Sequence, residues 1–210
     1  MPSLIARFLP IILTRTIRFD TPNPSWLSPP IMEIHGPWKI VSSQEIYSDP
    51  WMDLRLDQVI RPDGNAGTYS TVRLKAGVCV IAVDSQKNVH LTREFHYAVG
   101  RVTLEGVSGG IEPGEDPLEC ARRELREELG IVANAWKELG WVDPFTSAIA
   151  SPTRLYLATD LTFVPPENEG TECIERVEMS LDEALQAIDA QTITHAPTCV
   201  ALLKIALLNR

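Results

Sequence analysis

The sequence predicts a sandwich of strands and helices, either α/β or α+β, preceded by a small antiparallel β lobe. Short runs rich in branched and aromatic residues alternate with turns, one run is apolar on both faces, and later segments have helical patterns. Of the 210 residues, 44% are hydrophobic and 22% are charged. This balance supports a packed core and excludes a disordered chain, a collagen-like chain and a disulfide-dense mini-protein.

The first segment, residues 1–31, differs in character from the rest. It holds an apolar run at 4–13, three arginines before Asp20, and a proline-rich linker at 22–30. The run is shorter than the ~20 residues that cross a bilayer, so we expect no membrane partner. Two interpretations remain, a floppy extension from an upstream start with Met32 as the true start, and a targeting peptide. The absence of a small-residue cleavage site favours the extension.

The next segment, residues 32–75, reads as an N-terminal β lobe. Turns at 48–50 and 62–65 separate three strand-like runs, at 38–47, 54–61 and 68–74. A sheet of this size cannot bury both of its faces alone. We therefore expect it to pack against a symmetry mate and form a homodimer.

Residues 76–210 have the pattern of the main domain. The run Gly77–Val83 is apolar on both faces and predicts a buried strand. A helix is expected over Pro117–Leu129, ended by Gly130, and another begins at Ser180 with Glu183 completing a capping box. An acidic loop covers 165–172. The remaining expected elements are strands at 90–95, 102–105, 136–142, 154–160 and 174–179 and a helix at 197–208.

Charge and cysteine usage limit the partners. The chain has 19 Lys plus Arg against 28 Asp plus Glu, a net charge of −9, so we expect no nucleic-acid partner. A phosphate-bearing small molecule stays compatible if bound cations invert the local field. The four cysteines, Cys79, Cys120, Cys173 and Cys199, form no CxxC pair, which argues against a zinc site. We expect free thiols in a reducing, cytoplasmic compartment, with Cys79 and Cys120 buried.

The helix at Pro117–Leu129 gathers negative charge. Its apolar stripe is Leu118, Ala121, Leu125 and Leu129, and Glu124, Glu127 and Glu128 lie together on one turn beside it. Three carboxylates near a helix C-terminus repel one another unless a cation lies between them. Hard oxygen ligands suit Mg²⁺, with Mn²⁺ as the alternative. Spacing alone leaves open a second interpretation, a solvated acidic face paired with Arg122, Arg123 and Arg126.

The longer segment Gly109-x5-Glu115-x7-Arg123-Glu124-Leu125-x-Glu127-Glu128-x-Gly130-Ile131 resembles the Nudix box at every fixed position. The resemblance implies an α/β/α sandwich whose box glutamates hold divalent metal on a diphosphate. Glu124 and Glu128 are then the main metal ligands, with Glu127 a further or alternate ligand and the Ser108 carbonyl completing the shell. Glu115 and Arg123 are implied to pair and brace the loop against the helix.

The flanks resemble the ADP-ribose pyrophosphatase branch of this family, which cleaves nucleoside diphosphate sugars. The N-terminal β lobe, the segment 93–100 (REFHYAVG) and the segment 171–175 (TECIE) carry this likeness. In the branch, the first glutamate of the latter segment is the candidate catalytic base, which implies this role for Glu172. The rivals are Glu169 in the loop and Glu175 on the following strand.

Several positions depart from the branch or admit two interpretations. His96 stands where the branch has arginine, so one diphosphate contact is weakened or made pH-dependent. Ser108 replaces an alanine before the box and contributes only its carbonyl, and Glu105 keeps an acidic position that contacts substrate or metal. Trp38 is either a base-stacking residue or a core tryptophan. Arg73 either reaches a phosphate across the dimer or is a surface arginine.

These observations together predict a divalent-metal-dependent hydrolase that splits a nucleoside diphosphate sugar, with ADP-ribose favoured. The alternatives are a Nudix hydrolase for another nucleotide, such as GDP-mannose or a damaged nucleotide, and a non-catalytic Nudix ligand sensor. A sensor would have a damaged box and an added DNA-binding helix pair, and the sequence shows neither.

Overall fold

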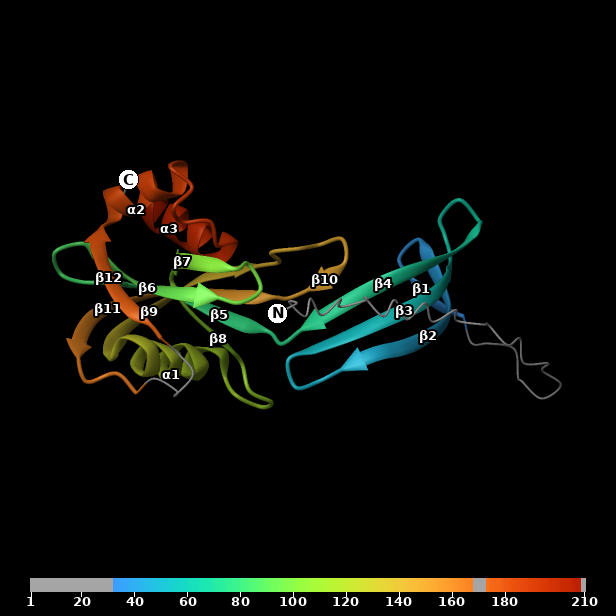
Figure 1. The fold of residues 1–210 in the computed structure, drawn as a ribbon, viewed down its shortest axis with the longest axis horizontal. Helices are drawn as coiled ribbons and strands as arrows, with labels where there is room; N and C mark the ends of the chain where they lie inside the picture. Colours follow the sequence, from blue (N-terminus) through green and yellow to red (C-terminus); the bar gives the residue numbers. More distant parts are fainter. Residues whose placement is uncertain (1–31, 168–172, 209–210) are drawn as a thin grey trace, which may run out of the picture.

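A computed structural model describes residues 32–167 and 173–208 of the chain. Two sheets lie end to end along its long axis (Figure 1). The N-terminal sheet has the strand order β1-β2-β3-β4-β10, antiparallel except for the β4–β10 pair. Its strands are β1 (Glu33–His35), β2 (Trp38–Ser48), β3 (Met52–Ile60), β4 (Ala66–Leu74) and β10 (Ile149–Ala150).

The second sheet has seven strands, in the order β12-β6-β5-β11-β9, with β7 pairing to β6 and β8 to β5. Its centre is the parallel pair β5–β11, and its other pairs are antiparallel. The strands are β5 (Gly77–Val83), β6 (Asn88–His96), β7 (Arg101–Glu105), β8 (Val107–Gly110), β9 (Ile131–Val142), β11 (Thr153–Phe163) and β12 (Glu175–Ser180).

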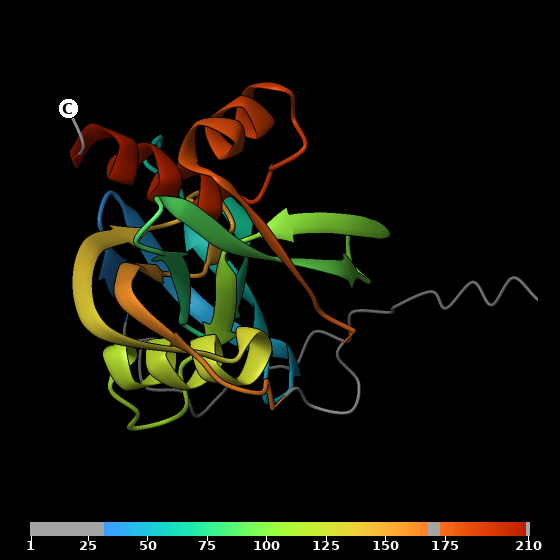
Figure 2. The same ribbon diagram turned by 90° about the vertical axis from the view of Figure 1, so that its left-hand side faces the viewer.

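Helices cover both faces of this second sheet. The helix α1 (Pro117–Leu129) lies on one face, and α2 (Leu181–Asp189) and α3 (Ala196–Leu208) lie on the other (Figure 2). Each face has its own apolar cluster, one around Leu125 beneath α1 and one around Leu202 beneath α2 and α3. Five consecutive residues of β5 are buried between them, from Val78 to Ala82. The predicted α/β sandwich is confirmed.

The ends of α1 follow from local chemistry. The Asp116 side chain accepts from the backbone N–H groups of Leu118 and Glu119, which caps the first turn. At the other end Gly130 has φ +61°, and a Cβ there would lie 2.1 Å from the Val164 carbonyl oxygen. Only glycine meets both demands, so the helix ends where the sequence predicts. The predicted capping box of Ser180 and Glu183 is also present at α2.

Several boundaries differ from the sequence prediction, most of all the start of β9, and the strands β1, β8 and β10 were not predicted. The strand β9 begins at Ile131, directly after the helix cap, whereas the sequence predicted a start at residue 136. The first residues of β9 include polar Asn134 and two alanines, so they lack a strand pattern of their own. They are held in the sheet by pairing with the far end of β11. The strand β8 was missed because Gly109 and Gly110 have low β propensity, yet they pair with Val78 and Gly77.

The N-terminal sheet has little interior. Among its described residues only Val59 is fully buried, and no helix covers either face (Figure 1). Cys79 and Cys120, by contrast, are fully buried in the second unit, as predicted, and burial raises the pKa of each thiol to about 12. In the part of the chain that the structure describes, no helix is both long and apolar enough to cross a membrane.

Candidate active site

One arginine organises the acidic turn of α1. Arg123 donates through Nε to Glu115 Oε1 at 3.0 Å and through Nη1 to Glu124 Oε1 at 2.8 Å and Glu127 Oε2 at 3.0 Å. Its hydrogen bonds to Glu115 lower the pKa of that carboxyl below its usual range, and the carboxylates raise the pKa of Arg123. The loop before α1 and the helix are therefore joined through a single guanidinium, in the pairing of Glu115 with Arg123 that the family resemblance implies.

The first glycine of the motif makes room for a carboxylate. A Cβ on Gly109 would lie 2.0 Å from Glu124 Cδ and 2.1 Å from its Oε1, far inside van der Waals contact. The Glu124 side chain consequently rests directly on the backbone of β8. The backbone of Ser108 and Gly109 and the acidic turn of α1 are thus brought together, although fifteen or more residues separate them in the chain.

The donor set at this turn is composed of oxygen. Three carboxylates from Glu124, Glu127 and Glu128 and the neighbouring backbone of β8 offer the hard ligands that Mg²⁺ and Mn²⁺ prefer. Within residues 32–167 and 173–208, no three Asp, Glu, His or Cys side chains already converge as metal ligands. The Arg123 guanidinium instead lies between two of the carboxylates. The oxygen ligands suit a divalent cation, and the Arg123 guanidinium lies beside two of them.

A second cluster surrounds Glu105 at the end of β7. Its carboxylate lies 3.5 Å from His96 Nε2 and 3.2 Å from His195 Nδ1. The same Nδ1 is 2.8 Å from the Thr198 hydroxyl, which accepts from the Gly106 N–H at 2.8 Å. Burial lowers the pKa of His195; His96 acts in the same direction, whereas Glu105 opposes it. The structure thus joins two predicted site residues, His96 and Glu105, to one network.

Sequence reasoning missed His195 and Thr198 in this network. Thr198 is fully buried in α3, and it is one of the few polar residues in an otherwise apolar helix. That isolated hydroxyl was the available signal, because a buried polar group needs a partner. The partner, the backbone of Gly106, lies 92 residues earlier in the chain.

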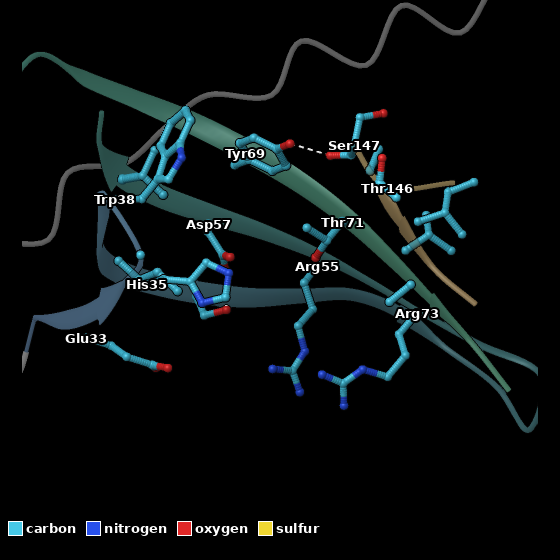
Figure 3. A pocket seen from close by; sticks show the side chains of 18 of the residues that line it. Glu33, His35, Trp38, Arg55, Asp57, Tyr69, Thr71, Arg73, Thr146 and Ser147 are labelled. Carbon is cyan, nitrogen blue, oxygen red and sulfur yellow. Dashed lines mark hydrogen bonds between the residues drawn. The ribbon is translucent and has the colours of Figure 1, made fainter. Parts of the chain in front are cut away.

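Trp38 and Arg73 line one cavity of about 670 Å³, on the N-terminal sheet (Figure 3). The Trp38 ring meets Tyr69 edge-on with centroids 5.3 Å apart, and the Tyr69 hydroxyl donates to the Ser147 carbonyl. Arg55 and Arg73 extend side by side from neighbouring strands. The sheet that bears this cavity extends away from α1 (Figure 1).

A smaller cavity, of about 530 Å³, lies beside the acidic turn. Its lining includes Glu128 and Leu129 at the end of α1 and Arg176 of β12. The remaining lining residues are Phe163, Val164, Pro165, Pro166 and Ile174.

The loop that follows bears the predicted base. Glu172 and its rival Glu169 lie outside the described residues, so the assignment of Glu172 stays a prediction from the sequence. The other rival, Glu175, lies on β12 and accepts from Arg93 Nη1 at 3.3 Å.

Comparison with known proteins adds to this geometry. The NUDIX domain matches residues 73–198, and the nucleoside diphosphate sugar hydrolase N-terminal domain matches residues 38–72. An ADP-ribose pyrophosphatase from Bacillus subtilis is 27% identical over 172 residues, 78% of this chain and 90% of that protein. A methanol dehydrogenase activator from Bacillus methanolicus is 28% identical over 171 residues, with the same two coverages.

The fold likewise has a solved counterpart. A crystal structure of an ADP compounds hydrolase superimposes with a TM-score of 0.71 at 22% sequence identity. The match covers 80% of this chain and 92% of that one. It therefore includes both sheets of the fold described above.

Proposed function

This chain belongs to the Nudix hydrolase family, and from that premise we propose that it hydrolyses the diphosphate bond of a nucleoside diphosphate sugar. ADP-ribose is the first candidate, giving AMP and ribose 5-phosphate. The observation that carries the proposal is the acidic turn of α1 held against Gly109 by Arg123 and Glu124. The matching N-terminal domain and the Bacillus subtilis relative support the nucleotide-sugar substrate.

Glu124 and Glu128 are the proposed main ligands of a divalent cation, with Glu127 as a further ligand and the Ser108 carbonyl completing the set. Mg²⁺ is the proposed ion, with Mn²⁺ as the alternative. Bound there, the ion neutralises diphosphate oxygens and lowers the pKa of the attacking water. Arg123 offsets the repulsion among the carboxylates and holds them on one side of the helix.

The proton of the attacking water needs an acceptor other than the metal ligands. Glu172 is the proposed base, from its position in the segment 171–175. Glu175 is the weaker rival, because Arg93 already bonds its carboxylate. Glu172→Gln is expected to lower kcat roughly a hundredfold or more and to leave KM nearly unchanged. If Glu169→Gln produces that loss and Glu172→Gln does not, the base lies elsewhere in the loop.

The second substrate-contacting region is the cavity on the N-terminal sheet. Trp38 is proposed to stack on the base and Arg73 to reach a phosphate, and His96 and Glu105 to contact substrate nearer the diphosphate. Because this sheet extends away from α1 (Figure 1), we propose that a partner copy in a homodimer supplies the cavity. The free cysteines among the described residues support a reducing, cytoplasmic location.

A substrate panel tests the proposal. Purified protein with Mg²⁺ receives ADP-ribose, GDP-mannose and an oxidised nucleoside triphosphate, and the nucleotide products are separated by chromatography. We expect AMP from ADP-ribose at the highest kcat/KM. Glu128→Gln should lower that rate by on the order of a hundredfold or more. The control is Glu119→Gln on the same helix, whose side chain is exposed and, among the described residues, pairs with Arg122.

Two results would contradict the proposal. Faster turnover of GDP-mannose or of the oxidised nucleotide would assign a different Nudix substrate. Tight binding of ADP-ribose without turnover in the presence of Mg²⁺ would indicate a ligand sensor.

A further inference from the structure

The arginines of the described chain divide into two groups. Six have a carboxylate oxygen within 4.0 Å, and this includes exposed residues such as Arg126 and Arg154. Four have none among the described residues, namely Arg55, Arg73, Arg101 and Arg176. Arg101 instead donates to the Thr194 hydroxyl at 2.8 Å. The other three line cavities, and of these Arg176 is the one beside the acidic turn.

Among the described residues, Arg176 has no carboxylate oxygen within 4.0 Å, although the net charge of the chain is −9. Acidic side chains are abundant on this surface, and a planar fork of N–H donors pairs readily with carboxylate or phosphate. A guanidinium that lines a cavity is therefore able to bind an anion from solution.

The structure also holds this guanidinium in place. The Cζ atom of Arg176 lies 5.0 Å from the centre of the Phe163 ring, a cation–π contact. The Phe163 ring in turn meets the His90 ring edge-on, with centroids 5.2 Å apart, and His90 is only 1% exposed. The backbone of Arg176 is fixed by its pairing with Thr92 on β6. The Phe163 ring, the buried His90 ring behind it and the pairing of β12 with β6 together fix the position of the Arg176 guanidinium.

The cavity that Arg176 faces has a defined chemistry. Glu128, a proposed metal ligand, lines the same cavity, and its apolar lining residues include Val164, Pro165 and Ile174. A volume of about 530 Å³ is within the range of small-ligand pockets and accommodates a sugar phosphate. An anion bound to metal at Glu128 would present its remaining oxygens toward the guanidinium.

We propose that Arg176 binds the phosphate on the sugar half of the substrate and that Phe163 packs against the sugar. The inference rests on the proposed hydrolase function and deepens it. The proposed cavity for the base lies on the N-terminal sheet, so the cavity beside Glu128 is left for the sugar-phosphate half. Arg176 is thereby a substrate-binding residue that distinguishes the two halves of the diphosphate.

Product inhibition separates the two halves experimentally. ADP-ribose hydrolysis is measured with increasing ribose 5-phosphate or AMP, in the full-length protein and in Arg176→Gln and Arg176→Lys. For Arg176→Gln we expect KM for ADP-ribose and the inhibition constant of ribose 5-phosphate each to rise about tenfold or more. The inhibition constant of AMP should stay within about twofold. Arg176→Lys keeps the charge but loses the fork, and should fall between the two.

The matched control is Arg154→Gln, an exposed arginine on β11 that is ion-paired with Glu138 at 2.7 Å. It should change neither inhibition constant, and thermal unfolding of all variants checks the fold. Active protein whose Arg176 variants keep both constants would overturn the assignment of Arg176 alone. Loss of AMP inhibition instead would overturn the assignment to the sugar half. Absence of turnover in the unsubstituted protein would overturn the hydrolase function and, with it, this inference.

Discussion

The two sheets of the molecule differ in what covers them. The second sheet has helices on both faces and two apolar clusters, and most residues of β5 are inaccessible to solvent. The N-terminal sheet has similar strand lengths and regular pairing but a single buried residue, Val59, among those described. Backbone pairing alone thus builds a sheet here, whereas only the second sheet has the burial that makes it stable by itself.

This difference separates the two roles. The helix-covered unit positions the acidic turn, because α1 is packed by Leu125 and Leu129 and braced by Arg123. The open sheet presents side chains, among them Trp38 and Arg73, on a surface that has room for a ligand or a second chain. Four experiments test this division between the two sheets.

The largest effect is expected on stability, when a leucine in each of the two units is replaced by alanine. Leu125→Ala removes a side chain that is fully buried beneath α1 and should cost about 2–5 kcal/mol of unfolding free energy. Leu56→Ala on β3 removes a half-buried side chain and should cost about 1 kcal/mol. Urea unfolding at one protein concentration compares the two. Equal losses would show that the N-terminal sheet shares the stability of the main core.

A smaller effect, on catalysis and not on stability, is expected at β8. Gly109→Ala would place a Cβ inside the Glu124 carboxylate and displace it, so kcat/KM should fall by on the order of tenfold to a hundredfold. Gly110→Ala is the control, because the three atoms nearest to its Cβ all belong to the flexible Lys75 side chain. If both variants keep full activity, Glu124 does not need its position on β8.

Assembly gives the third effect. We expect light scattering to report a dimer at micromolar concentration. The apparent unfolding free energy should then rise by about 1.4 kcal/mol for each tenfold increase in protein concentration. A monomeric mass with a concentration-independent unfolding midpoint would show that the open sheet stays uncovered in solution.

The smallest effect concerns His90, whose two ring nitrogens have no hydrogen bond among the described residues. Burial lowers the pKa of His90, as does Arg176, whereas Glu178 and Asp84 oppose the shift. The folded state therefore binds fewer protons than the unfolded state, and stability falls as the pH drops below about 6.5. His90→Leu should weaken that fall by about 1 kcal/mol between pH 7 and pH 5 and stay near neutral at pH 7. Unfolding curves with the same pH slope would contradict this.

Local patterns were sufficient for much of the fold. Gly77–Val83 and Pro117–Leu129 were predicted to the residue, because a doubly apolar run and a pair of helix caps are signals within a few positions. The start of β9 was not predicted correctly, because its first residues are held in the sheet by pairing with β11 and not by a pattern in their own sequence. β8 was missed for a related reason, because its glycines serve the approach of Glu124.

The site could be predicted only where its residues lie close together in the sequence. The box residues, including the Glu115–Arg123 pair, lie within one loop and helix. His195 and Thr198 join Glu105 and Gly106 across about ninety residues, and no local pattern encodes that contact. The sequence likewise did not single out Arg176. Its role depends on the contact with Phe163 on another strand and on having no carboxylate partner among the described residues, and neither can be seen in the local sequence.

The two-residue strand β10 gives the molecule a mechanical property. The chain leaves the N-terminal sheet after β4 and enters β5 within three residues, and β10 later returns to pair with Val72 and Arg73 in parallel. Two connections therefore join the N-terminal sheet to the second sheet, the link between β4 and β5 and the β4–β10 pair, and together they restrict rotation about either one. Arg73 stands opposite Ala150, three residues before Thr153 opens the central strand β11. The position of the N-terminal sheet relative to the second sheet of the same chain is thus set when the chain folds.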